Sequence, residues 1–64
     1  MKNYIRANLS NGTLIFDGTL SLVPRKDEEI DVNGNVFVVE NVRHVLKEGA
    51  SNSNYVLLRL RSID

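Results

Sequence analysis

The sequence predicts one small all-β domain over residues 1–64, built as a five-stranded, strongly bent antiparallel sheet. Asn-Gly pairs at 11–12 and 33–34 stand between segments in which apolar and polar residues alternate, as in two-residue β-hairpins. Such alternation also recurs near the C-terminus. A chain of 64 residues has room for one thin core and no more.

The first hairpin is predicted from residues 4–10 and the strand that follows Asn11-Gly12. A two-residue turn there puts apolar residues of both strands on one face. It sets five cross-strand pairs, which are Ile5–Gly18, Arg6–Asp17, Ala7–Phe16, Asn8–Ile15 and Leu9–Leu14.

The second strand is expected to be long, over residues 13–23, and to bend at Gly18. A turn at Asp17-Gly18 is the alternative, but it would place apolar residues opposite polar ones. Gly18 is therefore interpreted as a bend or bulge that lets a small sheet curl. Pro24 ends the strand because proline cannot donate a backbone hydrogen bond.

A polar connection over residues 24–28 leads to the second hairpin, with strands at 29–32 and from 35 onward. The Asn33-Gly34 turn places apolar residues together on one face. Its pairs are Val32–Asn35, Ile30–Phe37 and Glu28–Val39, with Asp31 and Glu29 opposite Val36 and Val38 on the other face.

Residues 41–48 fit two structures. As a helix, the segment would be capped by Asn41 and ended by Gly49. As a strand, which we favour because Val and His are weak helix formers, the chain kinks near Glu40-Asn41. The strand would pair with a last strand over residues 55–63 through Val42–Leu58, Arg43–Leu57, His44–Val56 and Val45–Tyr55. Residues 47–54 are expected to form a mobile loop.

Side chains alternate between the two faces of each predicted strand, and the residues that face inward are expected to form the core. Its members are Ile5, Ala7, Leu9, Leu14, Phe16, Leu20, Leu22, Ile30, Val32, Phe37, Val39, Val42, Val56, Leu58 and Leu60. In strand spacing alone, the chain resembles small SH3-like barrels. An OB-like barrel, or a sheet with a short helix at 41–48, is the alternative.

Composition excludes several classes of function. There are no cysteines, so neither a disulfide nor a thiolate metal site supports the fold, which suggests a reducing, cytoplasmic setting. No apolar run is long enough for a transmembrane helix, and we expect no membrane partner. Eight basic and eight acidic residues cancel. We expect no cofactor and no enzymatic activity.

Two polar features have ordinary explanations. His44 is the only histidine, and without a second ligand or a nucleophile beside it we expect a half-buried, hydrogen-bonded strand residue. Asp27, Glu28, Glu29 and Asp31 do not match a calcium loop. They are interpreted as a solvated edge that discourages edge-to-edge aggregation.

Two surfaces are candidates for binding. Val36, Val38 and Leu57 face outward, together with Ile15, and an exposed apolar patch is typical of a protein-binding or self-association site. Nucleic acid is the alternative partner, because Arg43, Arg59 and Arg61 could take phosphates while Tyr55 stacks on a base. The sequence favours a non-enzymatic interaction or assembly module, with a nucleic-acid-binding barrel as second choice.

Overall fold

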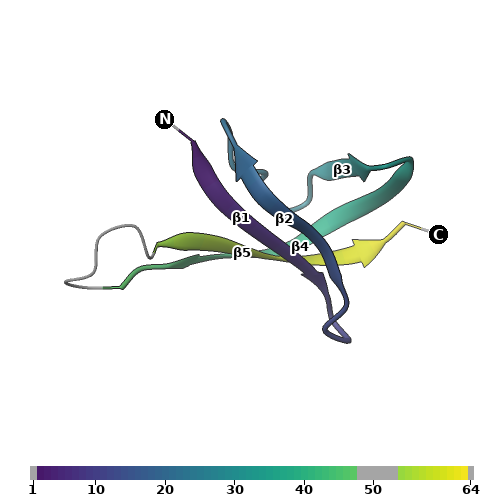
Figure 1. Cartoon of the computed structure of the whole chain (residues 1–64). Coiled ribbons are helices and arrows are strands. Elements are labelled where there is room, and N and C mark those ends of the chain that lie inside the picture. The colour runs from purple at the N-terminus through teal and green to yellow at the C-terminus, as the bar shows by residue number, and fades with distance from the viewer. Residues whose placement is uncertain (1, 48–53, 64) are drawn as a thin grey trace.

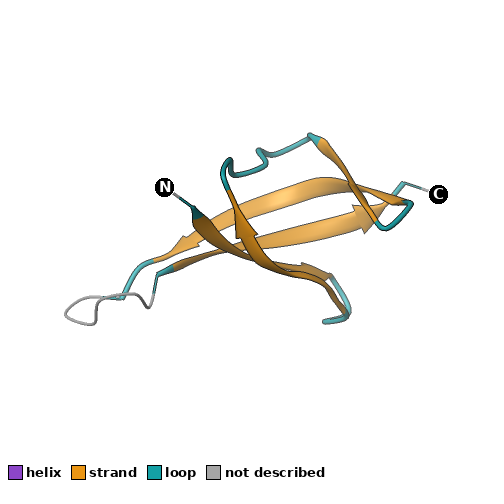
Figure 2. Cartoon of the chain, turned by 45° about the horizontal axis from the view of Figure 1, so that its top comes forward, coloured by secondary structure: helices purple, strands orange, loops and turns teal. Residues whose placement is uncertain are grey.

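The computed structural model describes residues 2–47 and 54–63 of the chain. Five strands make up the fold, namely β1 (Asn3–Leu9), β2 (Leu14–Leu20), β3 (Glu29–Val32), β4 (Asn35–Val45) and β5 (Tyr55–Ser62). Figure 2 shows strands and loops without a helix in this part of the chain. The strand interpretation of residues 41–45 is thus confirmed. Most of the predicted loop at 47–54 lies outside the described residues.

The five strands form one mixed sheet in the order β2-β1-β5-β4-β3, which curls into a half-barrel (Figure 1). Three strand pairs are antiparallel, as expected, but β1 and β5 are parallel, with Ala7 opposite Leu58. This pairing places β5, which has three of the seven buried core residues, at the centre of the sheet between β1 and β4. No turn joins them, so the sequence offered no cue to their direction.

The first hairpin confirms three predicted pairs but has a different turn. Leu9 N donates to Thr13 O at 2.9 Å, and Gly12, with φ of 93°, is the one turn residue in a left-handed conformation. The turn is therefore one residue longer than expected. A bulge compensates, because Asn8 pairs with Leu14 while Ala7 still pairs with Phe16.

The bulge reverses two side-chain assignments. Leu14, predicted to face the core, is 50% exposed, whereas Ile15, predicted to face outward, packs against the core. The Leu9–Leu14 and Asn8–Ile15 pairs were therefore wrong. Leu22, also predicted inward, is 82% exposed because β2 ends at Leu20 instead of residue 23.

Gly18 is neither a bend nor a bulge. It pairs regularly with Ile5 in the middle of β2. A Cβ built on Gly18 would lie 3.1 Å from Phe16 Cζ, so the ring occupies the space that a side chain would need. The glycine makes room for an aromatic residue on its own face of the strand.

The second half of the sheet follows the predicted register throughout. Asn33 and Gly34 both have positive φ, 53° and 92°, as the two-residue turn requires. Ile30 pairs with Phe37, and Val42 with Leu58. The expected kink is a register shift between Val39 and Asn41.

The concave side of the curled sheet, here called the inner face, carries the core. Its buried members are Ile5, Ala7, Phe37, Val39, Val56, Leu58 and Leu60. Every other residue of the predicted inward set, except Leu14 and Leu22, packs against them. The structure is thus consistent with a small β-barrel fold left open between β2 and β3.

Candidate interaction site

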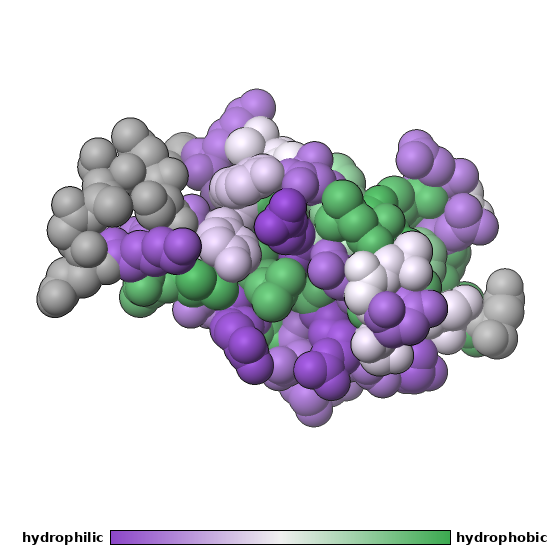
Figure 3. All heavy atoms as spheres, turned by 60° about the horizontal axis from the view of Figure 1, so that its bottom comes forward, coloured by the Kyte–Doolittle hydropathy of each residue, from purple (hydrophilic) through white to green (hydrophobic). Residues whose placement is uncertain are grey.

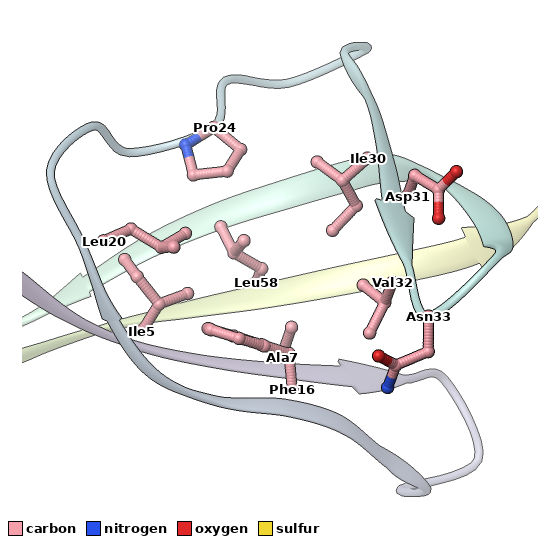
Figure 4. A pocket seen from close by; sticks show the side chains of 10 residues that line it. All are labelled: Ile5, Ala7, Phe16, Leu20, Pro24, Ile30, Asp31, Val32, Asn33 and Leu58. Atoms are coloured by element: carbon pink, nitrogen blue, oxygen red, sulfur yellow. The ribbon is translucent and has the colours of Figure 1, made fainter.

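The opening between the two edge strands is an apolar groove of about 300 Å³, called here the β2–β3 groove. Figure 4 shows its apolar side chains pointing toward one another. Those that line it are Ile5 and Ala7 from β1, Phe16 and Leu20 from β2, Ile30 and Val32 from β3, Leu58 from β5, and Pro24, Asp31 and Asn33.

The floor and the walls of the groove differ in burial. Ile5, Ala7 and Leu58 on the floor are at most 1% exposed, whereas the β2 and β3 side chains on the walls are only partly buried. The Asp31 carboxylate points away from the apolar side chains (Figure 4) and accepts a hydrogen bond from Gly34 N at 2.8 Å. The groove can therefore receive apolar groups.

The two edges that flank the groove are unequal. β3 has four residues, and two of them, Glu29 and Asp31, are exposed carboxylates. β2 has seven residues and a single charged one, Asp17. Short, charged edges resist pairing with another strand, whereas longer and less charged edges accept it. β2 is thus the more open of the two edges.

Asp17 is held by two neighbours on the outer, convex face of the sheet. Tyr4 donates a hydrogen bond from its hydroxyl to Asp17 Oδ1, and Arg6 Nε lies 3.6 Å from Asp17 Oδ2. The hydrogen bond to Asp17 raises the pKa of Tyr4, slight desolvation and the negative charge of Asp17 add to it, and Arg6 opposes it. The one charge on the β2 edge is therefore partly neutralised within its own sheet.

The predicted apolar patch on the outer face is not continuous. Val36 and Val38 lie together on β4, where Val38 pairs with Arg61. On β5, Leu57 lies four positions from Arg61, or about 13 Å. Its neighbours on the adjacent strands are Arg43 on β4 and Arg6 on β1. All three apolar residues are half-buried. Hydrophilic side chains likewise interrupt the hydrophobic ones on the side seen in Figure 3.

The candidate nucleic-acid residues do share the outer face. Arg61 Nε lies 3.4 Å from Glu40 Oε2. Within residues 2–47 and 54–63, no carboxylate lies within ion-pair distance of Arg43 or Arg59, and both are exposed. Tyr55 is half-buried opposite Val45. Two arginines are thus available for an anionic partner.

The other polar candidates are solvated. His44 is exposed rather than half-buried, because β4 extends with β5 beyond the curled part of the sheet. Arg25 pairs with Glu28 at 3.7 Å, and Lys26 with Asp27 at 3.9 Å. Among the described residues, no group of three or more His, Cys, Asp or Glu side chains is placed to hold a metal ion.

Searches against protein-family models, curated proteins and solved structures found no match to this chain. In the described part of the chain, no helix has the length and apolar character to span a membrane. The candidate site therefore depends on geometry alone. The alternation of the sequence had placed the apolar strand residues of the groove on the inner face, but it gave no sign that β2 and β3 would be the edges.

Proposed function

We propose that this chain is a non-enzymatic interaction or assembly module and that it binds its partner in the β2–β3 groove. The observation that carries the proposal is the meeting of an apolar groove with an open strand edge. Phe16 and Leu20 on β2, with Ile30 and Val32 on β3, leave apolar surface in contact with solvent. Burying that surface against a partner is favourable.

The geometry suits an extended segment of polypeptide. A strand placed along β2 would make backbone hydrogen bonds to the free edge, and its alternate side chains would enter the groove. The outer-face residues Val36, Val38 and Leu57 offer a weaker site, because arginines separate Leu57 from the two valines.

The proposal can be tested by selection from a displayed library of extended peptides with alternating apolar and polar residues. Selected peptides are then measured against Ile30→Lys, which places a charge in the groove, and against Val38→Lys, which changes charge equally on the outer face. We expect binding to fall at least tenfold with Ile30→Lys, because a buried ammonium is costly, and to persist with Val38→Lys.

Circular dichroism and urea unfolding of both variants serve as controls for folding. Peptides that bind Ile30→Lys as well as wild type, or a library that yields no binder, would overturn the groove proposal. Loss with Val38→Lys instead would support the outer-face patch.

Nucleic acid is the second candidate partner, favoured by the exposed and unpaired positions of Arg43 and Arg59 in the described chain. Their guanidinium groups could contact phosphates while Tyr55 lies nearby on β5. Binding of a labelled single-stranded oligonucleotide would weaken as salt rises and would be lost in Arg43→Gln with Arg59→Gln. Absence of binding at low salt rejects this candidate.

A further inference from the structure

We infer that the β2 edge pairs with β2 of a second copy of this chain, antiparallel and about a twofold axis at Gly18. This inference rests on the proposed function, because it names the occupant of the same edge and groove. It would join two half-barrels into one continuous sheet, with the β2 strands side by side.

The two edges of the sheet differ in their fitness for self-pairing. Two copies of β3 would bring the carboxylates of Glu29 and Asp31 close to those of the other copy. Like charges on neighbouring strands destabilise a pair. β2 carries no lysine and no proline, and Asp17, its one charge, already contacts Arg6 and Tyr4.

The sequence around Gly18 is self-complementary. A twofold interface requires each residue to meet the residue at the same distance on the other side of the axis. Apolar residues, Phe16 and Leu20, stand two positions from Gly18 on either side within β2. Within the regular part of β2, the resulting pairs are Asp17–Thr19 and Phe16–Leu20.

Charge, side-chain parity and the bulge in β2 together favour this register, because an axis at Phe16 would pair the bulged residues Leu14 and Ile15 with Gly18 and Asp17. An axis at Asp17 would place the two Asp17 carboxylates opposite each other, and a register with an odd shift would place inner residues opposite outer ones. An axis at Thr19 avoids the carboxylate clash but sets Gly18 opposite Leu20, so Leu20 loses its aromatic partner. The axis at Gly18 sets Phe16 opposite Leu20, and aromatic–aliphatic pairs stabilise a sheet.

Pairing about Gly18 also accounts for exposed apolar surface. Phe16 and Leu20, the apolar residues on either side of Gly18, are only partly buried in the single chain. The second copy would bring its own Phe16 and Leu20 beside the β2 wall of the groove. The chain has a formal net charge of zero, so long-range repulsion between copies is small.

Position 19 gives a test that depends on the sign of the charge. Thr19 is exposed on the outer face and would lie opposite Asp17 of the other copy, twice in each dimer. Sedimentation at low salt should show a dimer whose dissociation constant falls roughly tenfold with Thr19→Lys. It should rise by a similar factor with Thr19→Asp.

Thr13→Lys and Thr13→Asp provide matched controls, because Thr13 is exposed and lies outside the paired segment. They should leave the dissociation constant nearly unchanged. A wild-type chain that stays monomeric at the concentrations used for NMR would overturn the inference. So would a weaker dimer with Thr19→Lys, which an axis at Thr19 predicts, or equal effects at positions 13 and 19.

Failure here can be told apart from failure of the proposed function. A monomer that still binds selected peptides in the groove, and loses them with Ile30→Lys, keeps the interaction module and rejects the second copy as its occupant. A monomer that binds none of them rejects both.

Discussion

The ring of Phe16 lies against the backbone of Gly18, with Phe16 Cζ 3.1 Å from the point where a Cβ would stand at position 18. Both residues are on β2, and Phe16 also lines the β2–β3 groove. The absence of a side chain at Gly18 therefore sets the position of an aromatic ring that forms part of the candidate site.

Alanine at position 18 should be coupled to the residue at position 16. Because the ring must shift by a few tenths of an ångström, Gly18→Ala should be less favourable beside Phe16 than beside leucine in Phe16→Leu. We expect a coupling energy of about 0.5–1 kcal/mol from a double-mutant cycle measured by urea unfolding. A coupling near zero would mean that the ring does not depend on the glycine.

The bulge in β2 leads to an expectation opposite to that from simple alternation. Ile15 packs against the core and Leu14 is half exposed. Ile15→Ala should therefore lower the free energy of unfolding by about 1–3 kcal/mol, and Leu14→Ala by clearly less in the monomer. Both are measured at a concentration below that of any association. A larger loss at Leu14 would place the bulge elsewhere.

Leu58 forms both the floor of the groove and the centre of the core. It is 1% exposed on β5, between β1 and β4. Leu58→Ala should reduce the free energy of unfolding by about 2–5 kcal/mol, which is enough to unfold much of a domain this small. Leu22→Ala, at an 82% exposed position, is the matched control and should change it by less than about 0.5 kcal/mol in the monomer.

The contact between Tyr4 and Asp17 gives a pH dependence with a definite sign. The hydrogen bond that Tyr4 donates raises the pKa of Tyr4 in the folded state. Its contribution to stability is therefore complete below the unfolded tyrosine pKa of about 10 and is lost as pH rises through the higher folded value.

Phenolate absorbance during a pH titration measures the pKa of Tyr4 directly, and the variant Tyr4→Phe identifies which part of the signal comes from Tyr4. We expect Asp17→Asn to lower the pKa of Tyr4, since it replaces the charged acceptor. A Tyr4 titration that is the same in wild type and Asp17→Asn would show that the contact is absent in solution.

Local chemistry made much of the fold predictable. A two-residue turn requires positive φ at both positions, and Asn33 and Gly34 tolerate it well. The turn could therefore be placed from the sequence, and its position fixed the register of β3 and β4. Alternation then gave the pairing of β4 with β5. Asn11-Gly12 was misleading, because the same two residues also fit a longer turn in which only Gly12 has positive φ. The compensating bulge then exchanged the environments of Leu14 and Ile15.

The site was harder to predict than the fold. Alternation shows which side of a strand is apolar, but it does not show which strands lie at the edges. The parallel neighbours β1 and β5 are separated by nearly the whole chain, and no turn marks their pairing. The open β2 edge and the groove follow from that pairing, whereas alternation alone indicated Val36, Val38 and Leu57 as the binding surface.

The most direct test of the account asks which surface changes its environment when the protein binds. NMR spectra of methyl, aromatic and amide groups are recorded as the protein is diluted from high concentration. We expect concentration-dependent shifts at Phe16, Leu20 and Ile30, and constant positions for Val38 and Leu57. Shifts confined to Val38, Leu57 and the arginines of the outer face would contradict the claim that the open β2 edge and its groove form the binding surface. No shifts at all would contradict the pairing of two copies through that edge.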